Sequence, residues 1–423
     1  MRKVLVLLLV LMVSASLFAG GGNQQQQANE IRVLLANHPY GDLLKDKLPE
    51  FERAYGIRVI WEQLNETQLN QKLTTEFATG ASTVDVFMTR PLQETLLFLK
   101  NNWLAPLDGY DFSDYPSNTV DIGRKDGKAH VVPLIVEWQV LYYRIDLLRA
   151  ANLQVPTTLA ELENAARILN RDGVAGFASR GAASPGVTQL SSYIFNFGGR
   201  FMENGQSAFN TPAAMEAIRY YGRMNGTYGP PGIGGMSWDQ LMPVFQAGRL
   251  AMWTDASVFY GQLIDPARTQ VPAANIGVAR LPRGPARDEP FIVVPWGLSM
   301  SSRTRNRDAA MTFLTWASSR EMQREGMLRN ITMVRTSLWT DTSITSLMNP
   351  GLVDTMIHAS ANGYDLDRPF ITSIVRARDL IGELITESIN TRGTSPGLQA
   401  LADQKVREVN DLLRADGEFG SAR

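Results

Sequence analysis

The sequence predicts an α/β protein divided into two lobes, and three observations support this prediction. The chain has 423 residues, whereas a single hydrophobic core stops growing at roughly 250–300 residues. Strand-like and helix-like segments alternate through the N-terminal part of the chain. Beyond residue 131 this alternation gives way to extended apolar runs joined by Gly- and Pro-rich connections. Two packed cores are therefore expected.

The N-terminus has the composition of a secretory signal. Arg2 and Lys3 precede an apolar run at 4–13, which is followed by small and apolar residues at 14–19. The run is shorter than the ~20 residues that span a bilayer, which argues against a transmembrane anchor. We expect residues 1–19 to be the signal peptide, with cleavage after Ala19 or, alternatively, after Ala15. The polar residues at 20–29 are expected to form a flexible leader.

The sequence contains no cysteine, and its charges nearly cancel. The absence of cysteine excludes disulfides, thiolate metal sites and a lipid anchor on cysteine. An exported protein without such an anchor stays near the cell only behind an outer barrier, so a periplasmic location is expected. The formal net charge of -1 gives no basic excess to attract nucleic acid. It points instead to a neutral or weakly charged ligand.

The first lobe begins with alternating strands and helices. Strands are expected at 31–35, 57–61 and 84–88, and helices at 42–55 and 64–79, each ended by a glycine. This order predicts a mostly parallel sheet covered on both faces. Ligands bind beyond the carboxyl ends of such strands. The loops that contain His38 and Arg90 are therefore expected to face a ligand.

The pattern after residue 131 is different. Two extended runs at 131–136 and 140–143 are separated by Glu137, Trp138 and Gln139. Further along, we expect a helix opened by a capping box at Thr158 and Glu161, loops at 226–235 and 282–290, and a largely helical segment at 368–413 that is broken at 393–397. No internal repeat is present.

Common catalytic and metal-binding motifs are missing from the sequence. The three histidines, His38, His130 and His358, lack the spacing of metal ligands, and no nucleophile elbow, phosphate loop or dinucleotide fingerprint occurs. No metal and no cofactor are therefore expected. Glu137 and Asp255 both lie among aromatic residues and are the candidate carboxylate pair for an exported glycan-cleaving enzyme. This enzyme is the alternative function.

Tryptophan occurs in three short motifs that are expected to lie in polar loops, Glu-Trp-Gln, Trp-Thr-Asp and Pro-Trp-Gly, which contain Trp138, Trp253 and Trp296. An indole face packs against the C–H side of a sugar or polyol, while nearby carboxylates and amides hydrogen-bond its hydroxyls. The polar neighbours suited to this task are Glu137, Gln139 and Asp255. The alternative is that each tryptophan is a packing residue, but their recurrence beside polar groups favours a binding role.

Six short motifs then follow one another along nearly the whole mature chain. They lie at 48–59 (LPEFERAYGIRV), 84–88 (VDVFM), 103–107 (WLAPL), 141–147 with 156–162 (LYYRIDL, PTTLAEL), 245–252 (FQAGRLAM) and 334–337 (VRTS). In this order they resemble motifs of the bacterial extracellular solute-binding proteins of the carbohydrate-importer class, which includes maltose- and polyol-binding proteins. Arg144, Leu159 and Val334 depart from the family pattern.

The resemblance implies a fold. It is the two-lobed periplasmic-binding-protein fold of type II, in which each lobe is a mostly parallel sheet flanked by helices and the ligand lies in the cleft between the lobes. The first lobe is expected to comprise 30–137 and 290–330, and the second 138–289 and 331–423. The third crossover would fall at 330–335. Trp296 would then face Trp253 and Asp255 across the cleft.

The resemblance also implies a function. The chain is expected to be the monomeric binding component of an ABC importer, which captures a sugar or sugar alcohol by lobe closure and delivers it to a membrane permease. Binders of peptides, polyamines or metal ions form a third class, but they usually need a charged or histidine-rich cleft. The expected ligand-binding residues are His38, Arg90, Glu137, Trp138, Gln139, Trp253, Asp255, Trp296 and Arg335.

Overall fold

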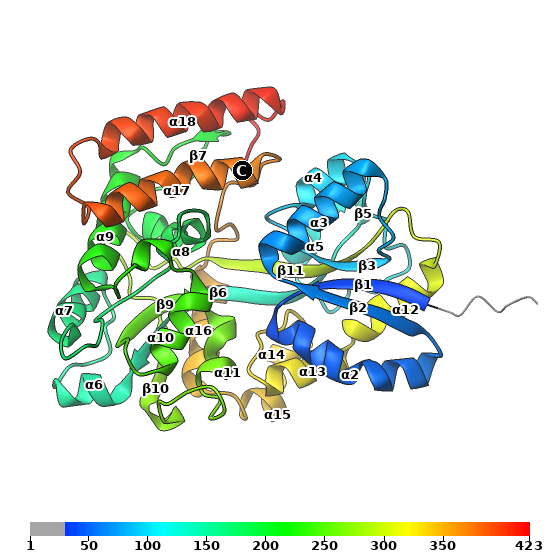
Figure 1. Cartoon of the computed structure of the whole chain (residues 1–423), viewed down its shortest axis with the longest axis horizontal. Helices are drawn as coiled ribbons and strands as arrows, with labels where there is room; N and C mark the ends of the chain where they lie inside the picture. The colour runs from blue at the N-terminus through cyan, green and yellow to red at the C-terminus, as the bar shows by residue number, and fades with distance from the viewer. Residues whose placement is uncertain (1–29) are drawn as a thin grey trace, which may run out of the picture.

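The computed structural model describes residues 30–423, so the expected signal peptide at 1–19 and leader at 20–29 lie outside the described residues. Two lobes lie side by side (Figure 1). The N-terminal elements and helices α12 (Arg307–Ala317) and α13 (Arg320–Leu328) form the first lobe. Most of the chain after residue 145 forms the second, in which the C-terminal helices α17 (Ile374–Asn390) and α18 (Leu398–Ala415) lie along one side.

The first lobe contains the expected parallel strands. Strand β1 (Glu30–Ala36) lies between β2 (Arg58–Leu64) and β3 (Val86–Thr89) and is parallel to both. Helix α2 (Pro39–Tyr55) follows β1, and α3 (Glu66–Thr79) follows β2. Each helix ends before a glycine with left-handed φ, 64° at Gly56 and 75° at Gly80, a backbone conformation that favours glycine. The strands and helices expected here are confirmed with small shifts of their ends.

A single long strand joins the lobes. Strand β6 (Val132–Arg144) continues through Glu137, where a break between two runs was expected. Its first half pairs antiparallel with β11 (Ile292–Met300), which also pairs antiparallel with β3. Its second half pairs antiparallel with β9 (Met252–Ala256) and β10 (Ile276–Arg280). The expected break is absent because both halves of the strand find hydrogen-bonding partners, one set in each lobe.

Strand directions in the second lobe are mixed. Strands β9 and β10 run antiparallel to β6, so the parallel pattern expected for each lobe holds mainly for β2, β1 and β3. Isolated parallel bridges join Ala175 to Leu250 and Ala178 to Trp253 of β9. Because Ala256 pairs with Gln139 near the middle of β6, the carboxyl end of β9 points to the region between the lobes. The parallel segment 175–178 ends on the same side.

The remaining elements complete the two lobes. The capping box at Thr158 and Glu161 and the two C-terminal helices separated near residue 393 are confirmed. The elements not yet given are α4 (Thr95–Lys100), α5 (Ser117–Asp121), β4 (Arg124–Lys125), β5 (Lys128–Ala129), α6 (Ile145–Ala150), α7 (Leu159–Leu169), α8 (Ala183–Asn196), β7 (Met202–Glu203), β8 (Gln206–Ser207), α9 (Pro212–Tyr228), η1 (Ile233–Gly235), α10 (Trp238–Gln246), η2 (Ser257–Phe259), α11 (Tyr260–Leu263), η3 (Ala273–Asn275), α14 (Thr336–Trp339), α15 (Thr342–Thr345) and α16 (Pro350–Asn362).

The third connection between the lobes lies later in the chain than expected. The Val136 N–H donates to the Thr332 carbonyl, and the Val334 N–H donates to the Leu134 carbonyl, so 332–334 lies beside the first half of β6. Asp114 of the first lobe then pairs with Arg335 and accepts hydrogen bonds from Ser337 at the start of α14. These contacts keep 331–345 with the first lobe. The chain reaches the second lobe between α15 and α16.

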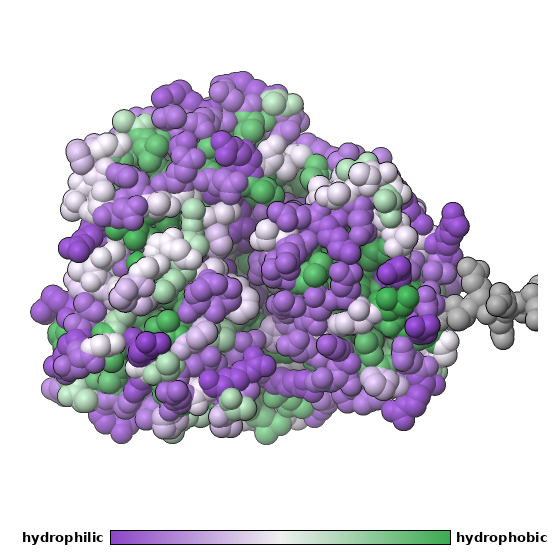
Figure 2. Space-filling model, in the orientation of Figure 1, coloured by the Kyte–Doolittle hydropathy of each residue, from purple (hydrophilic) through white to green (hydrophobic). Residues whose placement is uncertain are grey.

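The surface of the molecule is largely polar on the face shown in Figure 2. Hydrophilic residues cover most of the face in Figure 2, and apolar residues form only scattered groups on it. Among residues 30–423, no helix combines the length and apolar character needed to cross a membrane. In the same part of the chain, no three His, Asp or Glu side chains are grouped in a way that would hold a metal ion.

Candidate functional site

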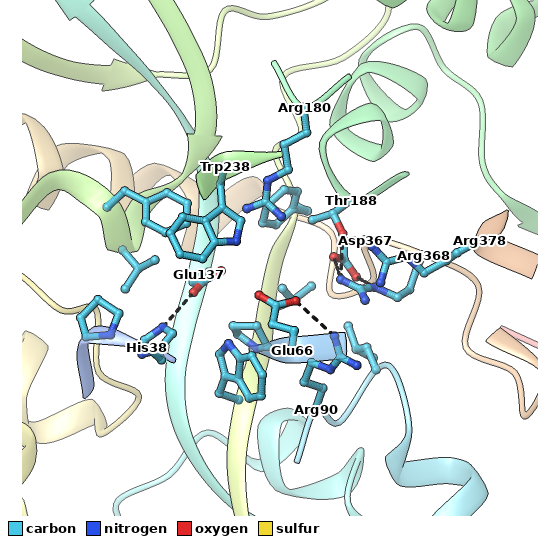
Figure 3. Close-up of a pocket in the computed structure, with 18 of the residues that line it drawn as sticks. His38, Glu66, Arg90, Glu137, Arg180, Thr188, Trp238, Asp367, Arg368 and Arg378 are labelled. Carbon is cyan, nitrogen blue, oxygen red and sulfur yellow. Dashed lines mark hydrogen bonds and ion pairs between the residues drawn. The ribbon is translucent and has the colours of Figure 1, made fainter. Parts of the chain in front are cut away.

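A cavity lies between the lobes and encloses about 720 Å³, counting the part that opens to solvent. Side chains from both lobes converge on it (Figure 3). Its lining residues are Asn37, His38, Pro39, Glu66, Arg90, Leu92, Glu137, Arg180, Thr188, Trp238, Val258, Phe259, Phe291, Val293, Pro295, Trp296, Asp367, Arg368 and Arg378.

The first-lobe wall is built where the three parallel strands end. His38 follows β1 and is the N-cap of α2, where its Nδ1 atom accepts a hydrogen bond from the Tyr40 N–H at 3.1 Å. Glu66 is the first residue of α3, directly after β2. Arg90 directly follows β3. The carboxyl ends of neighbouring parallel strands lie at one edge of a sheet, so three distant segments of sequence reach the same cavity.

The second-lobe wall is built in a similar way. Arg180 follows the segment 175–178, and Phe259 follows β9. Trp238 is the first residue of α10, whose start is fixed by a capping box between Ser237 and Gln240. The Trp238 ring stacks on Phe259 with centroids 4.9 Å apart and planes inclined by 20°. This half-buried indole therefore has a fixed orientation at the cavity.

Aromatic surfaces thus come from both lobes. Trp296 on β11 lines the first-lobe side and is 4% exposed. The Arg90 guanidinium lies 5.6 Å from the centre of its ring, and the His38 ring lies 6.1 Å away. Trp238 lines the second-lobe side. A cavity with indole rings on opposite lobes suits a ligand that has an apolar C–H surface.

Two of the cavity arginines are held by carboxylates. Arg90 pairs with Glu66 at 3.2 Å and with Glu94 at 3.0 Å. Arg180 pairs with Asp255 at 2.6 Å; burial opposes its charge, but Asp255 more than offsets this and raises the pKa of Arg180 above its ordinary value. Within residues 30–423, Nη2 of Arg90 and Nη1 of Arg180 donate no hydrogen bond. Their charges are compensated, and these N–H groups are available to a ligand oxygen.

At one end of the cavity, side chains of the two lobes are hydrogen-bonded directly to each other. The Gln93 side-chain oxygen of the first lobe accepts hydrogen bonds from Arg368 at 2.7 Å and Arg378 at 2.8 Å, both in the second lobe. Arg368 also pairs with Asp367. Arg378 has no carboxylate partner among residues 30–423, and burial, with the nearby Arg368 and Arg90, holds its pKa well below its ordinary value.

Four of the nine residues expected to bind ligand line the cavity: His38, Arg90, Glu137 and Trp296. Asp255 lies one layer behind, where it is fully buried and binds Arg180 through both carboxylate oxygens. Its polar surroundings in the sequence therefore reflect a buried ion pair. Any effect of Asp255 on a ligand in this cavity would be exerted through Arg180.

The other four expected residues do not line the cavity. Trp253 is fully buried and stacks on the back of Phe259, with ring centroids 5.8 Å apart. Trp138 is also fully buried, and its indole N–H donates to Thr355 at 2.9 Å. Successive side chains of a strand point to opposite faces, so Glu137 reaches the cavity while Trp138 packs away from it. The buried Gln139 and Arg335, which pairs with Asp114 at 3.2 Å, complete this group. These positions correct the expected direct ligand contacts.

Several lining residues were not anticipated from the sequence. Glu66 follows β2 in the way that His38 follows β1 and Arg90 follows β3, so its place after a predicted parallel strand is the signal that identifies it. Trp238 had a detectable signal, a tryptophan one residue after a helix-capping serine. Arg368 and Arg378 had none, because Arg378 is placed by the packing of α17 against α8 and α9, and Arg368, which precedes α17, by its contact with Thr188 of α8.

The buried Glu137 leads to a testable stability difference. Burial raises the pKa of Glu137 in the folded protein, so its stabilising contribution is present when it is protonated and is lost as pH rises through the raised pKa. Glu137→Gln stays neutral. The ligand-free variant should melt about 1–3 °C above the parent protein near pH 7.5. The gap should close by about pH 4, where both side chains are uncharged; a gap that is constant with pH would contradict this assignment.

Comparison with known proteins gives the class of protein. The family model described as "Bacterial extracellular solute-binding protein" matches residues 36–324. The chain therefore belongs to the bacterial extracellular solute-binding proteins, as its motifs suggested. The family is one of binding proteins.

The chain can also be compared with individual proteins, one by sequence and two by structure. A mannitol-binding protein of Pseudomonas aeruginosa is 31% identical over 281 residues, a stretch that covers 64% of this chain and 64% of that protein. A solute-binding protein of Agrobacterium vitis, solved with bound D-mannitol, is 23% identical with a TM-score of 0.80, covering 90% of this chain and 99% of its own. One of Agrobacterium radiobacter, in complex with ribitol, is 24% identical with a TM-score of 0.80, covering 90% and 98%. These structures confirm the two-lobed periplasmic-binding-protein fold.

Proposed function

We propose that the chain is the binding component of an ABC importer and captures a sugar alcohol or small sugar between its lobes. One observation carries the proposal: a cavity formed by both lobes combines two indole faces with arginines whose charges are largely compensated. Such a site offers hydrogen-bond donors and apolar surface without a large excess of charge. A neutral molecule with many hydroxyls matches it, and the relative named as a mannitol-binding protein supports this class.

Capture then works through lobe closure. A ligand favours the closed form only if it contacts both lobes better there than in the open form. Moving a protein from ~1% to ~99% closed takes about 5.5 kcal/mol of differential binding. A micromolar site supplies about 8 kcal/mol in total, so one small ligand is sufficient. The closed, loaded protein would present its ligand to a membrane permease.

The proposed location of the protein rests on its sequence. The protein would be exported through the signal at 1–19 and act as a monomer in the periplasm, without a lipid anchor because it has no cysteine. The competing reading as a glycan-cleaving enzyme needs Glu137 and Asp255 to act together. Only Glu137 lines the cavity, and both oxygens of Asp255 are engaged by Arg180. Binding without cleavage is therefore the better-supported proposal.

A ligand panel tests the proposal. We expect D-mannitol, ribitol or a related alditol to raise the melting temperature, because ligand at 100 times its Kd stabilises the folded state by about 2.7 kcal/mol. Titration calorimetry on each hit gives the affinity, and an assay of reducing-sugar release on glycans serves as the control for turnover. If no alditol, monosaccharide or disaccharide binds, or if turnover depends on Glu137, the proposal is wrong.

A further inference from the structure

The ring of His38 has only one of its nitrogens satisfied by the protein. Nδ1 accepts the Tyr40 N–H at the start of α2, so it must carry a lone pair, and the neutral ring then has its proton on Nε2. Nε2 is buried and has no hydrogen-bond partner among residues 30–423. The helix start thus fixes the tautomer and leaves a buried N–H donor at the cavity. Buried donors without a partner are rare in folded proteins.

Glu137 supplies the complementary group. It is 9% exposed, and none of the hydrogen bonds within residues 30–423 ends on its carboxylate. Its nearest charged or chargeable neighbour is Nε2 of His38, 3.8 Å from Oε1, which is too long for a hydrogen bond. Figure 3 shows the two side chains pointing toward each other at the cavity. The donor and the acceptor are therefore adjacent but do not satisfy each other.

The separation of these two atoms fits one bridging oxygen. An oxygen about 2.8 Å from each of two atoms that lie 3.8 Å apart satisfies normal hydrogen-bond lengths on both sides. Such an oxygen must accept from Nε2–H and donate to the carboxylate. An alcohol does both, whereas an ether or carbonyl oxygen cannot donate and an ammonium group cannot accept.

We infer that His38 and Glu137 form a hydroxyl-selecting pair that holds one particular hydroxyl of the ligand as both acceptor and donor. This inference rests on the proposed function, since it concerns the same cavity. Trp296 lies beside His38, so the carbon chain next to that hydroxyl would pack against the indole. The pair would reject an analogue that lacks the hydroxyl, because a buried donor and a buried acceptor would then lose their partner.

Monodeoxy analogues test the inference. Ribitol has no rotation axis, so each of its hydroxyls is sampled by its own monodeoxy analogue; a monodeoxy derivative of D-mannitol, which has a two-fold axis, could bind end for end and keep a hydroxyl at the pair. If another alditol without such an axis binds more tightly, its own monodeoxy series is used. We expect calorimetry to show one analogue binding about 10–100-fold more weakly than the parent alditol because it lacks the bridged hydroxyl.

Two variants assign that loss to the pair. His38→Asn keeps a good helix N-cap but cannot reach the bridging position, and Glu137→Met keeps the side-chain length without an acceptor oxygen. In each variant, the parent alditol and the critical analogue should bind within about threefold of each other. If the two residues had only a structural role, each variant would bind both ligands more weakly by the same factor, and the ratio of the two affinities would be preserved. His130→Asn, outside the cavity, is the matched control and should retain the discrimination of the unmodified protein.

The outcomes separate this inference from the proposed function. Binding of no alditol at all would overturn both. Tight alditol binding with discrimination unchanged in His38→Asn and Glu137→Met would overturn the hydroxyl-selecting pair alone. That result would mean that the pair holds solvent and not a ligand hydroxyl. Because the readout is a ratio of affinities measured on each folded variant, a modest loss of stability does not obscure it.

Discussion

Replacing Trp238 with alanine is expected to weaken binding of the best alditol about 100-fold, or ~2.8 kcal/mol, with little change in the stability of the ligand-free protein. The indole lines the cavity from the second lobe and is only half-buried by the protein. The ligand would therefore cover apolar surface of the indole that the protein leaves exposed. Calorimetry gives the affinity, and thermal melting of the ligand-free variant gives the stability.

Trp253→Ala is the matched contrast for this prediction. Trp253 is fully buried and separated from the cavity by Phe259. Its removal leaves a large interior void, which costs about 3–5 kcal/mol of unfolding free energy. The melting temperature should fall strongly, while the affinity measured well below the melting temperature changes less than in Trp238→Ala. The reverse ranking of affinities would show that the wrong tryptophan has been assigned to the cavity wall.

Asp255→Ala should destabilise the protein and also impair binding. The carboxylate is fully buried and holds Arg180 with hydrogen bonds of 2.6–3.1 Å, while also accepting from Gln189 and from the Ala256 N–H. Removing one partner of a buried pair leaves an uncompensated charge and typically costs 3–5 kcal/mol. The melting temperature should fall by about 5–10 °C. Affinity should also fall, because the Arg180 guanidinium would no longer be fixed at the cavity.

A double variant separates these two effects. In Asp255→Ala combined with Arg180→Met, the unpaired charge is gone, so most of the lost stability should return while binding stays weak. Asp354→Ala is the control, because it breaks an ion pair with Arg280 in which both side chains are about half exposed, and such pairs contribute at most about 1 kcal/mol. If the double variant regained full affinity, Arg180 would have no part in ligand binding.

The sequence predicted the first-lobe wall better than the second. The strand-end rule led to His38 and Arg90 because each follows a parallel strand with a clear apolar pattern. Tryptophan in a polar motif led to Trp296, but also to Trp138 and Trp253, which are buried in the interior. Local composition cannot tell these cases apart. The direction of a strand side chain depends on register, and register is set by partner strands that lie far away in the sequence.

The second-lobe arginines show a different limit. Arg378 reaches the cavity because α17 packs against α8 and α9, whereas Arg368 precedes α17 and donates to Thr188 of α8. Gln93 of the first lobe accepts from both arginines. No short motif encodes contacts between segments nearly 300 residues apart. Asp255 illustrates the related problem for charge. A buried carboxylate looks the same in sequence whether its partner is a ligand or another side chain, and here the partner is Arg180.

The unbroken course of β6 through both lobes also bears on the order of events during capture. When two bodies rotate about a hinge, atoms near the axis travel least, and Glu137 lies near the middle of the strand that the bodies share. An incoming solute would meet the Glu137 end of the cavity almost fully assembled. Trp238, which lies farther from the axis, would reach the solute only as the lobes close. Stopped-flow traces should then show changes at His38 or Glu137 slowing the association step, and loss of Trp238 chiefly hastening escape.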